Sequence, residues 1–258
     1  MQKTVLITGA SAGIGLALYG MLHNAGYKVY AASRSGSFPM DINDDASVNV
    51  AAEKIVAEST TLDILVCSAG NGIAGAVEDM TLDEVRYQME TNFFGTVRTI
   101  QSFLPVFRRQ GYGKIIVISS VAGLVPIPFQ SVYSASKAAI TIFCDALALE
   151  LKPYNIQVCS VLPGDTKTNF TAARRIAANA QSPSSAYKIR FEKSIGKMER
   201  DEQSGMSPEE VAKTVLRQIR RKRMCLHAVP GTCYKLICGA FRFLPARLKM
   251  WIVGLMYG

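Results

Sequence analysis

KTVLITGASAGIG, residues 3–15, decides the fold of this 258-residue chain. Residues 3–8 are a short β-branched run, as expected of a buried strand, and an apolar helical pattern begins at Ile14. Between them, Gly9, Gly13 and Gly15 let the backbone approach a phosphate, while the helix start offers free N–H groups and a positive dipole end. The segment therefore predicts a phosphate-binding strand–turn–helix unit; a glycine turn without a ligand is the alternative.

Repeated strand and helix patterns follow this unit. Strands are expected near 3–8, 28–33, 63–67, 114–119 and 156–161, separated by helical patterns. Capping boxes are predicted at Thr81–Glu84 and Ser207–Glu210, the second with Pro208 in the first helical position. The length suits one α/β domain. We predict a single doubly wound, Rossmann-type parallel sheet with helices on both faces over residues 1–230, and a helical extension over 231–258.

Tyr133 and Lys137 stand four residues apart in SVYSASKAA, which places both on one face of a helix. The unperturbed pKa of a phenol is about 10, and a neighbouring ammonium favours the phenolate. The pair can therefore bring a tyrosine into the range where it transfers a proton. A surface Tyr–Lys pair gives the same spacing, so the pair gains its meaning from the motifs around it.

Six segments of the chain occur in an order typical of one family. They are TGASAGIG at 8–15, CSAG at 67–70, Asn92 in METNFFGT, ISS ending at Ser120, YSASK at 133–137 and LPGDTKT at 162–168. With them the chain resembles the short-chain dehydrogenases/reductases from Lys3 to about Phe170, and within that family the 17β-hydroxysteroid and retinol dehydrogenase branch. The resemblance implies an enzyme that interconverts a carbonyl and an alcohol with a nicotinamide cofactor.

The resemblance also implies catalytic roles for Asn92, Ser120, Tyr133 and Lys137. Ser120 would hold the substrate oxygen while charge develops on it, and Tyr133 would pass it a proton. Lys137 would hold the nicotinamide ribose and lower the pKa of Tyr133. Asn92 would steady the site through a water near the lysine. Ser119 is the alternative candidate for the role of Ser120 and is expected to be structural instead.

The expected cofactor is NADP(H). Where NAD-using relatives carry an acid after the second strand, this chain has Ser33 and then Arg34, whose guanidinium suits a 2′-phosphate. Ser68 departs from the asparagine usual in the family. The residues expected around the cofactor are Gly9, Ser11, Gly13, Ile14, Gly15, Ser33, Arg34, Asp41, Ile42, Ser68, Ala69, Gly70, Tyr133, Lys137, Pro163, Gly164, Thr166 and Thr168.

The substrate pocket is expected between residues 123–129, the segment after Pro163-Gly164, and the tail. Leu124, Val125, Ile127 and Phe129 suit an apolar substrate such as a steroid, retinoid or lipid, although ordinary core would look the same. Relatives place a mobile lid where this chain has residues 171–205. The alternatives are a 3-oxoacyl or small-ketone reductase, and a non-catalytic NADP-binding scaffold that docks through its basic tail.

Cysteine and histidine usage favours a reducing compartment and no metal. The six cysteines show no C-x-x-C spacing, and Cys67 and Cys159 fall inside strand patterns, so we expect reduced core thiols. No signal peptide is expected, since residues 1–20 already carry the phosphate-binding pattern. A cytoplasmic location follows as the default. His23 and His227 show no ligand pattern, so no metal site is expected.

The net charge of +9 lies entirely in residues 183–258, which hold 15 basic and 6 acidic residues. Nothing there resembles a nucleic-acid-binding module, and no nucleic-acid partner is expected. Residues 231–258 read as two amphipathic segments broken at Pro245. We expect them to cover the pocket or pack on the core or another subunit, with peripheral membrane contact as the second choice. A homo-oligomer, dimer or tetramer, is expected.

Overall fold

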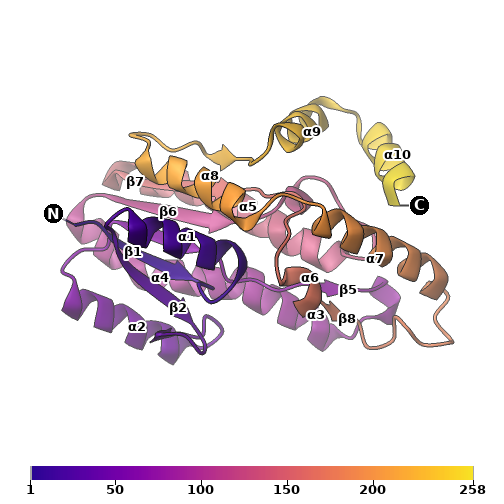
Figure 1. Cartoon of the computed structure of the whole chain (residues 1–258), viewed down its shortest axis with the longest axis horizontal. Coiled ribbons are helices and arrows are strands. Elements are labelled where there is room, and N and C mark those ends of the chain that lie inside the picture. Colours follow the sequence, from indigo (N-terminus) through magenta and orange to yellow (C-terminus); the bar gives the residue numbers. More distant parts are fainter. Residues whose placement is uncertain (1, 258) are drawn as a thin grey trace.

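One parallel sheet of seven strands organises residues 2–257, the part of the chain that this computed structural model describes (Figure 1). The strand order is β3-β2-β1-β4-β6-β7-β9. The strands are β1 (Thr4–Thr8), β2 (Lys28–Ser33), β3 (Phe38–Pro39), β4 (Ile64–Cys67), β6 (Gly113–Ile118), β7 (Ile156–Val161) and β9 (His227–Ala228), while β5 (Ile73–Ala74) and β8 (Arg175–Ile176) pair separately. The crossovers make the fold a doubly wound Rossmann type, as predicted.

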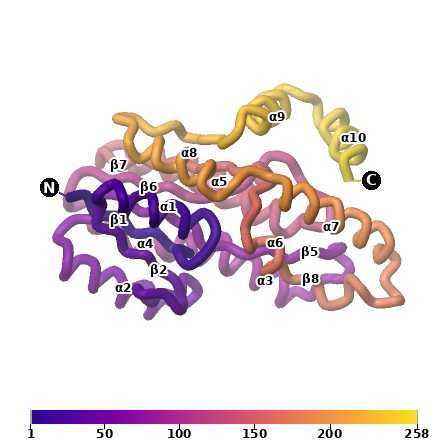
Figure 2. The backbone as a smooth tube through the Cα atoms, viewed as in Figure 1, coloured from indigo at the N-terminus to yellow at the C-terminus, as the bar shows by residue number. Residues whose placement is uncertain are grey.

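Helices cover both faces of the sheet, and each face has its own apolar core. On one side α1 (Gly13–Asn24) lies against α8 (Pro208–Arg220), and Figure 2 traces the two side by side. On the other side lie α2 (Asp45–Glu58), α4 (Gly95–Gln110) and α5 (Ser131–Leu151). The remaining helical segments are η1 (Val77–Asp79), α3 (Leu82–Met89), η2 (Glu90–Phe94), η3 (Val121–Gly123), η4 (Lys152–Tyr154), α6 (Phe170–Ala173), α7 (Lys188–Gln203), α9 (Thr232–Phe243) and α10 (Ala246–Tyr257).

The predicted strands lie within one residue of the observed ones at each end. Both capping boxes are present, with Thr81 and Ser207 each accepting a hydrogen bond from the backbone N–H three residues on. The sequence did not predict β3, β5, β8 or β9. These strands have two residues each, too short for an alternating pattern to reveal.

Four strands end together and define the edge at which the site forms. Parallel register places Thr8 of β1 beside Cys67 of β4, and Ile118 of β6 beside Val161 of β7. The segments that follow these ends carry the glycine loop, CSAG, Ser120 and Pro163-Gly164. Ligands of open α/β sheets bind at the carboxyl ends of the strands, so the topology collects the predicted motifs where such a ligand would lie.

Helices α9 and α10 break at Pro245, as predicted, and run along one side of the molecule (Figure 1). Their inner faces pack on η3, where Val121, Val125, Cys238, Phe241 and Val253 form a small apolar cluster. The Tyr234 hydroxyl donates to Asp165 Oδ2 (2.6 Å) and accepts from the Asp165 N–H (3.0 Å). The tail is therefore tied to the loop that follows β7.

One expectation about side chains needs correction. Not all six thiols lie in the core, because Cys233 is exposed and Cys225 half-buried; both belong to the tail or its approach, where the helices have an outer face. His227 has a structural contact, since its Nε2 lies 2.8 Å from Asp145 Oδ1 and joins β9 to α5.

Candidate active site

The glycine loop has the shape that a phosphate cradle needs. Gly9 and Gly13 have φ of +68° and +53°, a region that favours glycine. A Cβ on Gly15 would lie 2.3 Å from the Gly9 carbonyl oxygen, so the start of α1 can close on the loop only with glycine there. Ser11 and Ile14 lie in the same turn, and Thr168 packs against Gly13. The loop and the helix start can accept a pyrophosphate.

The end of β2 offers polar groups to a ligand. Ser33 is buried, and within residues 2–257 its Oγ has no hydrogen-bond partner. Such an atom costs free energy unless it is satisfied, which a bound ribose or phosphate oxygen would do. Arg34 beside it is exposed. These residues fit the adenosine end of a nicotinamide dinucleotide.

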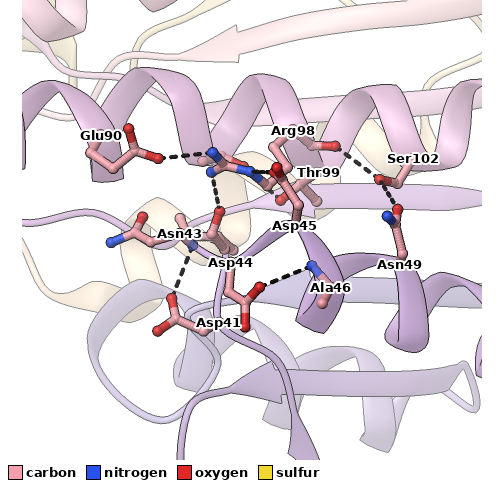
Figure 3. Close-up of polar contacts among 12 residues, drawn as sticks. Asp41, Asn43, Asp44, Asp45, Ala46, Asn49, Glu90, Arg98, Thr99 and Ser102 are labelled. Carbon is pink, nitrogen blue, oxygen red and sulfur yellow. Dashed lines mark hydrogen bonds and ion pairs between the residues drawn. The ribbon is translucent and has the colours of Figure 1, made fainter.

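An ion-pair network, shown in Figure 3, fixes the Asp41–Ile42 pair. Arg98 of α4 donates through Nη1 to the Ile42 carbonyl (2.7 Å) and also pairs with Asp45 and Glu90. Asp41 Oδ1 accepts from the Asn43 N–H at 2.9 Å. Arg98 therefore positions the segment expected beside the adenine. Sequence reasoning missed Arg98, because its partners lie in two other parts of the chain, at residues 42–45 and in η2.

After β4, the CSAG segment is held by backbone contacts. Thr8 Oγ1 accepts hydrogen bonds from the N–H groups of Ser68 (3.2 Å) and Ala69 (3.3 Å), so this anchor does not depend on the Ser68 side chain. A Cβ on Gly9 would lie 2.7 Å from the Ala69 Cα, which shows how closely the first glycine approaches this segment. The departure from the family's asparagine therefore leaves the loop in place.

Asn92 and Lys137 lie beside each other across Gly70. A Cβ on Gly70 would lie 3.2 Å from Asn92 Oδ1 and 3.6 Å from Lys137 Nζ. Asn92 sits in η2, a π-helical turn of the kind that often marks functional sites, and exchanges hydrogen bonds with the Asn71 backbone. Lys137 Nζ donates to the Ile118 carbonyl at 3.0 Å, and burial lowers its pKa to about 8.

Tyr133 lies on the same helix face, with the Lys137 Nζ 5.8 Å from its ring centroid. Burial raises the pKa of Tyr133 to about 12, although a hydrogen bond with Ser120 and the charge of Arg174 oppose the shift. In the protein alone burial outweighs the lowering influences and favours the neutral phenol, and the effect of Lys137 on this pKa stays a prediction. A neutral phenol is the form that donates a proton.

The two serines after β6 have different surroundings. Ser119 is buried, and its Oγ bonds to the Lys137 carbonyl (3.0 Å) and to Thr141 Oγ1 (2.7 Å). Ser120 caps η3 by accepting from the Ala122 N–H at 3.1 Å and also interacts with Tyr133. Ser120 is thus the serine next to the phenol.

The loop after β7 borders the candidate site on the side next to the tail. Thr166 Oγ1 donates to the Gly164 carbonyl at 2.8 Å, and Thr168 Oγ1 accepts from the Phe170 N–H at 3.1 Å. A Cβ on Gly164 would lie 2.2 Å from the Tyr234 ring, so glycine lets the tail approach next to Pro163. A crevice of about 390 Å³ opens here, lined by Asp165, Asp201, Ser204, Gly205, Met206, Gly231, Thr232, Cys233 and Tyr234.

The expected apolar wall divides between two clusters. Val125 packs under the tail, whereas Ile127 and Phe129 pack on the cluster formed with α7. Phe129 has a φ of 61°, which is rare for an aromatic residue and indicates a strained turn at this position. Leu124 stays exposed. Sequence reasoning missed Phe170, whose ring centroid lies 5.6 Å from that of Tyr133.

Comparisons with known proteins agree with this geometry. Residues 3–179 match the short chain dehydrogenase family. The chain is 36% identical to the 3-ketodihydrosphingosine reductase of Bacteroides thetaiotaomicron over 99% of its own length and 98% of that protein. It is 36% identical to human 17-beta-hydroxysteroid dehydrogenase type 1 over 66% of this chain and 58% of that one.

Solved structures show the same fold. A short-chain dehydrogenase from Streptomyces avermitilis superposes with a TM-score of 0.82 at 26% identity, covering 97% of both chains. Other solved members hold NAD in one case and NADP in another. This chain belongs to the short-chain dehydrogenase/reductase family and is an oxidoreductase that acts on carbonyl or alcohol groups.

Proposed function

We propose that this protein is an NADP(H)-dependent reductase of an apolar, long-chain ketone. The observation that carries the proposal is the juxtaposition of Ser120, Tyr133 and Lys137 at the carboxyl edge of the sheet. The relative named 3-ketodihydrosphingosine reductase, matched along almost the whole chain, supports the long-chain class over a small ketone or an acyl substrate. The intact set argues against a non-catalytic scaffold.

The side chains divide the work of reduction. The nicotinamide cofactor supplies a hydride to the carbonyl carbon. The Ser120 hydroxyl donates a hydrogen bond to the carbonyl oxygen as negative charge develops there. Tyr133 gives its phenolic proton to the same oxygen, and Lys137, held beside Asn92, presents its ammonium to ribose hydroxyls and to the phenolate that remains. In alcohol oxidation the same groups act in reverse.

NADP(H) is proposed over NAD(H) because of Arg34. Its exposed guanidinium follows the orphaned Ser33 hydroxyl at the end of β2, where a 2′-phosphate would lie. Asp41 and Ile42, fixed by Arg98, would flank the adenine. The glycine loop and Thr168 would hold the phosphates and the nicotinamide side.

The outer faces of α9 and α10 are proposed to rest on an anionic membrane. Their inner faces already pack on η3, yet large apolar side chains remain exposed, including Phe243 (89%) and Trp251 (62%). Lys235, Arg242 and Arg247 accompany them, and residues 211–258 contain no acid. If two copies met through this face, their basic side chains would repel each other, whereas anionic lipid headgroups complement the positive charge. An apolar substrate dissolved in the membrane would then lie near the site.

A homo-oligomer and a cytoplasmic location complete the proposal. Ile142 and Leu149 of α5 are 68% and 74% exposed, which leaves an apolar face that a second copy could cover.

The segment Ser131–Tyr154 is long and apolar enough to cross a membrane by length and composition. It carries Tyr133 and Lys137 and packs on β7 and η3, so a core helix explains its composition.

Tyr133→Phe should lower kcat for ketone reduction by about a hundredfold to ten-thousandfold, because only the hydroxyl supplies the proton. NADPH binding, measured by fluorescence titration, should stay within a few fold of wild type. Tyr154→Phe, which alters an exposed tyrosine on η4, is the matched control. Turnover of the Tyr133 variant close to that of wild type would remove this residue from the mechanism.

The pKa of Lys137 predicts the pH profile. Burial lowers this pKa to about 8, so the ammonium is present below that value and is lost above it. We expect kcat/KM for NADPH to fall about tenfold per pH unit on the alkaline side, since the ratio for the substrate that binds first reports the free enzyme. Circular dichroism across the range controls for unfolding. A profile that stays level well above the pKa would contradict the role of the charge.

Arg34→Asp should reduce the preference for NADPH over NADH by more than about tenfold, because a carboxylate repels the 2′-phosphate that the guanidinium attracts. Dissociation constants for both cofactors are compared in both proteins. Arg109→Asp changes the same charge on an exposed residue at the end of α4 and should leave the ratio alone. An unchanged ratio in the Arg34 variant would mean that Arg34 is a surface arginine only.

Trp251 is the single tryptophan and reports on membrane contact. Its emission should shift to the blue with vesicles containing phosphatidylglycerol, less with phosphatidylcholine alone, and should recover at high salt. Phe243→Ser should weaken binding, whereas Ile189→Ser, which removes an equally exposed apolar side chain on α7, should not. An equal response to both lipids would contradict contact with an anionic membrane. A molecular mass that increases with protein concentration in wild type but not in Phe243→Ser would show that the tail mediates self-association instead.

A further inference from the structure

Arg174 is a buried cation whose hydrogen-bonding capacity is only partly used. It is 8% exposed and lies between α6 and β8. Its Nη2 pairs with Glu202 of α7, but across residues 2–257 its Nε and Nη1 have no hydrogen-bond partner. Buried guanidinium donors without acceptors cost free energy, so their presence calls for an explanation.

The Arg174 guanidinium and Tyr133, the proposed proton donor, both lie close to the ring of Phe170. The guanidinium carbon of Arg174 is 5.9 Å from the Phe170 ring centroid, and that centroid is 5.6 Å from the ring of Tyr133. The charges of Arg174 and Glu202 both act on the pKa of Tyr133, in opposite directions. Arg174 therefore belongs to the surroundings of the reacting group, on the side of the segment after Pro163-Gly164.

The charge balance indicates which ligand would suit the site. Glu202 is 13% exposed, neutralises Arg174, and also accepts a hydrogen bond from Thr171 Oγ1 at 2.5 Å. An anionic ligand would bring a second negative charge next to Glu202 in a poorly hydrated place. An uncharged oxygen accepts from the free donors without that repulsion.

We propose that Nε and Nη1 of Arg174 donate hydrogen bonds to a second, uncharged oxygen of the substrate, a hydroxyl or carbonyl a few bonds from the reacting carbon. The inference rests on the proposed reductase function and refines its substrate class to ketones with a second oxygen function. Arg174 is then a specificity-determining residue, because a plain ketone would leave its donors unpaired.

Two ketones of equal chain length test this inference. Dodecan-3-one and 1-hydroxydodecan-3-one are titrated by calorimetry into the NADP⁺-loaded protein. Wild type should bind the hydroxyketone about ten- to hundredfold more tightly, the range expected for hydrogen bonds to a charged donor. Equal affinities in wild type would overturn the inference.

Variants identify the residue responsible. Arg174→Met combined with Glu202→Gln removes both charges and should bring the two affinities together. Arg174→Lys keeps a cation for Glu202, removes the second planar donor, and should also reduce the preference. Arg175→Met, which alters the exposed neighbour stacked on Tyr87, is the matched control and should keep it. A preference that survives in the double variant and in Arg174→Lys would overturn the inference.

Turnover separates this inference from the function on which it rests. NADPH oxidation is followed with both ketones in the same proteins. Reduction of the plain ketone, with no preference in binding for the hydroxyketone, would refute the role of Arg174 and leave the proposed reductase function standing. An Arg174-dependent preference in binding without turnover of either ketone would support the site and refute the reductase.

Discussion

The two ends of Lys137 hold helix α5 on the end of strand β6, and the rest of the site depends on this attachment. Its Nζ donates to the Ile118 carbonyl, while its own carbonyl accepts from Ser119 Oγ. A Cβ on Gly123 would lie 2.8 Å from the Lys137 carbonyl oxygen, so the turn after β6 also closes on this point. Because Tyr133 is one helical turn away, the same contacts place its phenol beside Ser120.

Burial moves the two titrating groups in opposite directions for one reason. The charged form is disfavoured in each, so the pKa of Tyr133 rises to about 12 and that of Lys137 falls to about 8. The protein alone therefore holds a neutral phenol beside an ammonium that is close to losing its proton. Pairing an ammonium with ribose oxygens stabilises its charged form, so cofactor binding is expected to strengthen the lysine's effect on the phenol.

The sequence predicts most strongly what short, local patterns encode. The strand ends, both capping boxes and the break at Pro245 follow from neighbouring residues, and the motif order predicts the layout of the site. What escaped prediction depends on distant partners. Arg98 acts through residues of separate elements, and Arg174 is defined by Glu202 on α7. The burial that raises the pKa of Tyr133 is likewise a property of packing, which spacing does not reveal.

The tail is attached to the loop after β7 and to two apolar clusters. Tyr234 holds Asp165, two residues after Pro163, while Tyr257 packs both on the cluster under η3 and on the cluster formed with α7. Because the inner face is already satisfied, membrane contact needs no unpacking of the tail. The two roles between which the sequence left a choice are therefore compatible, because packing uses the inner face of the tail and the proposed lipid contact uses the outer one.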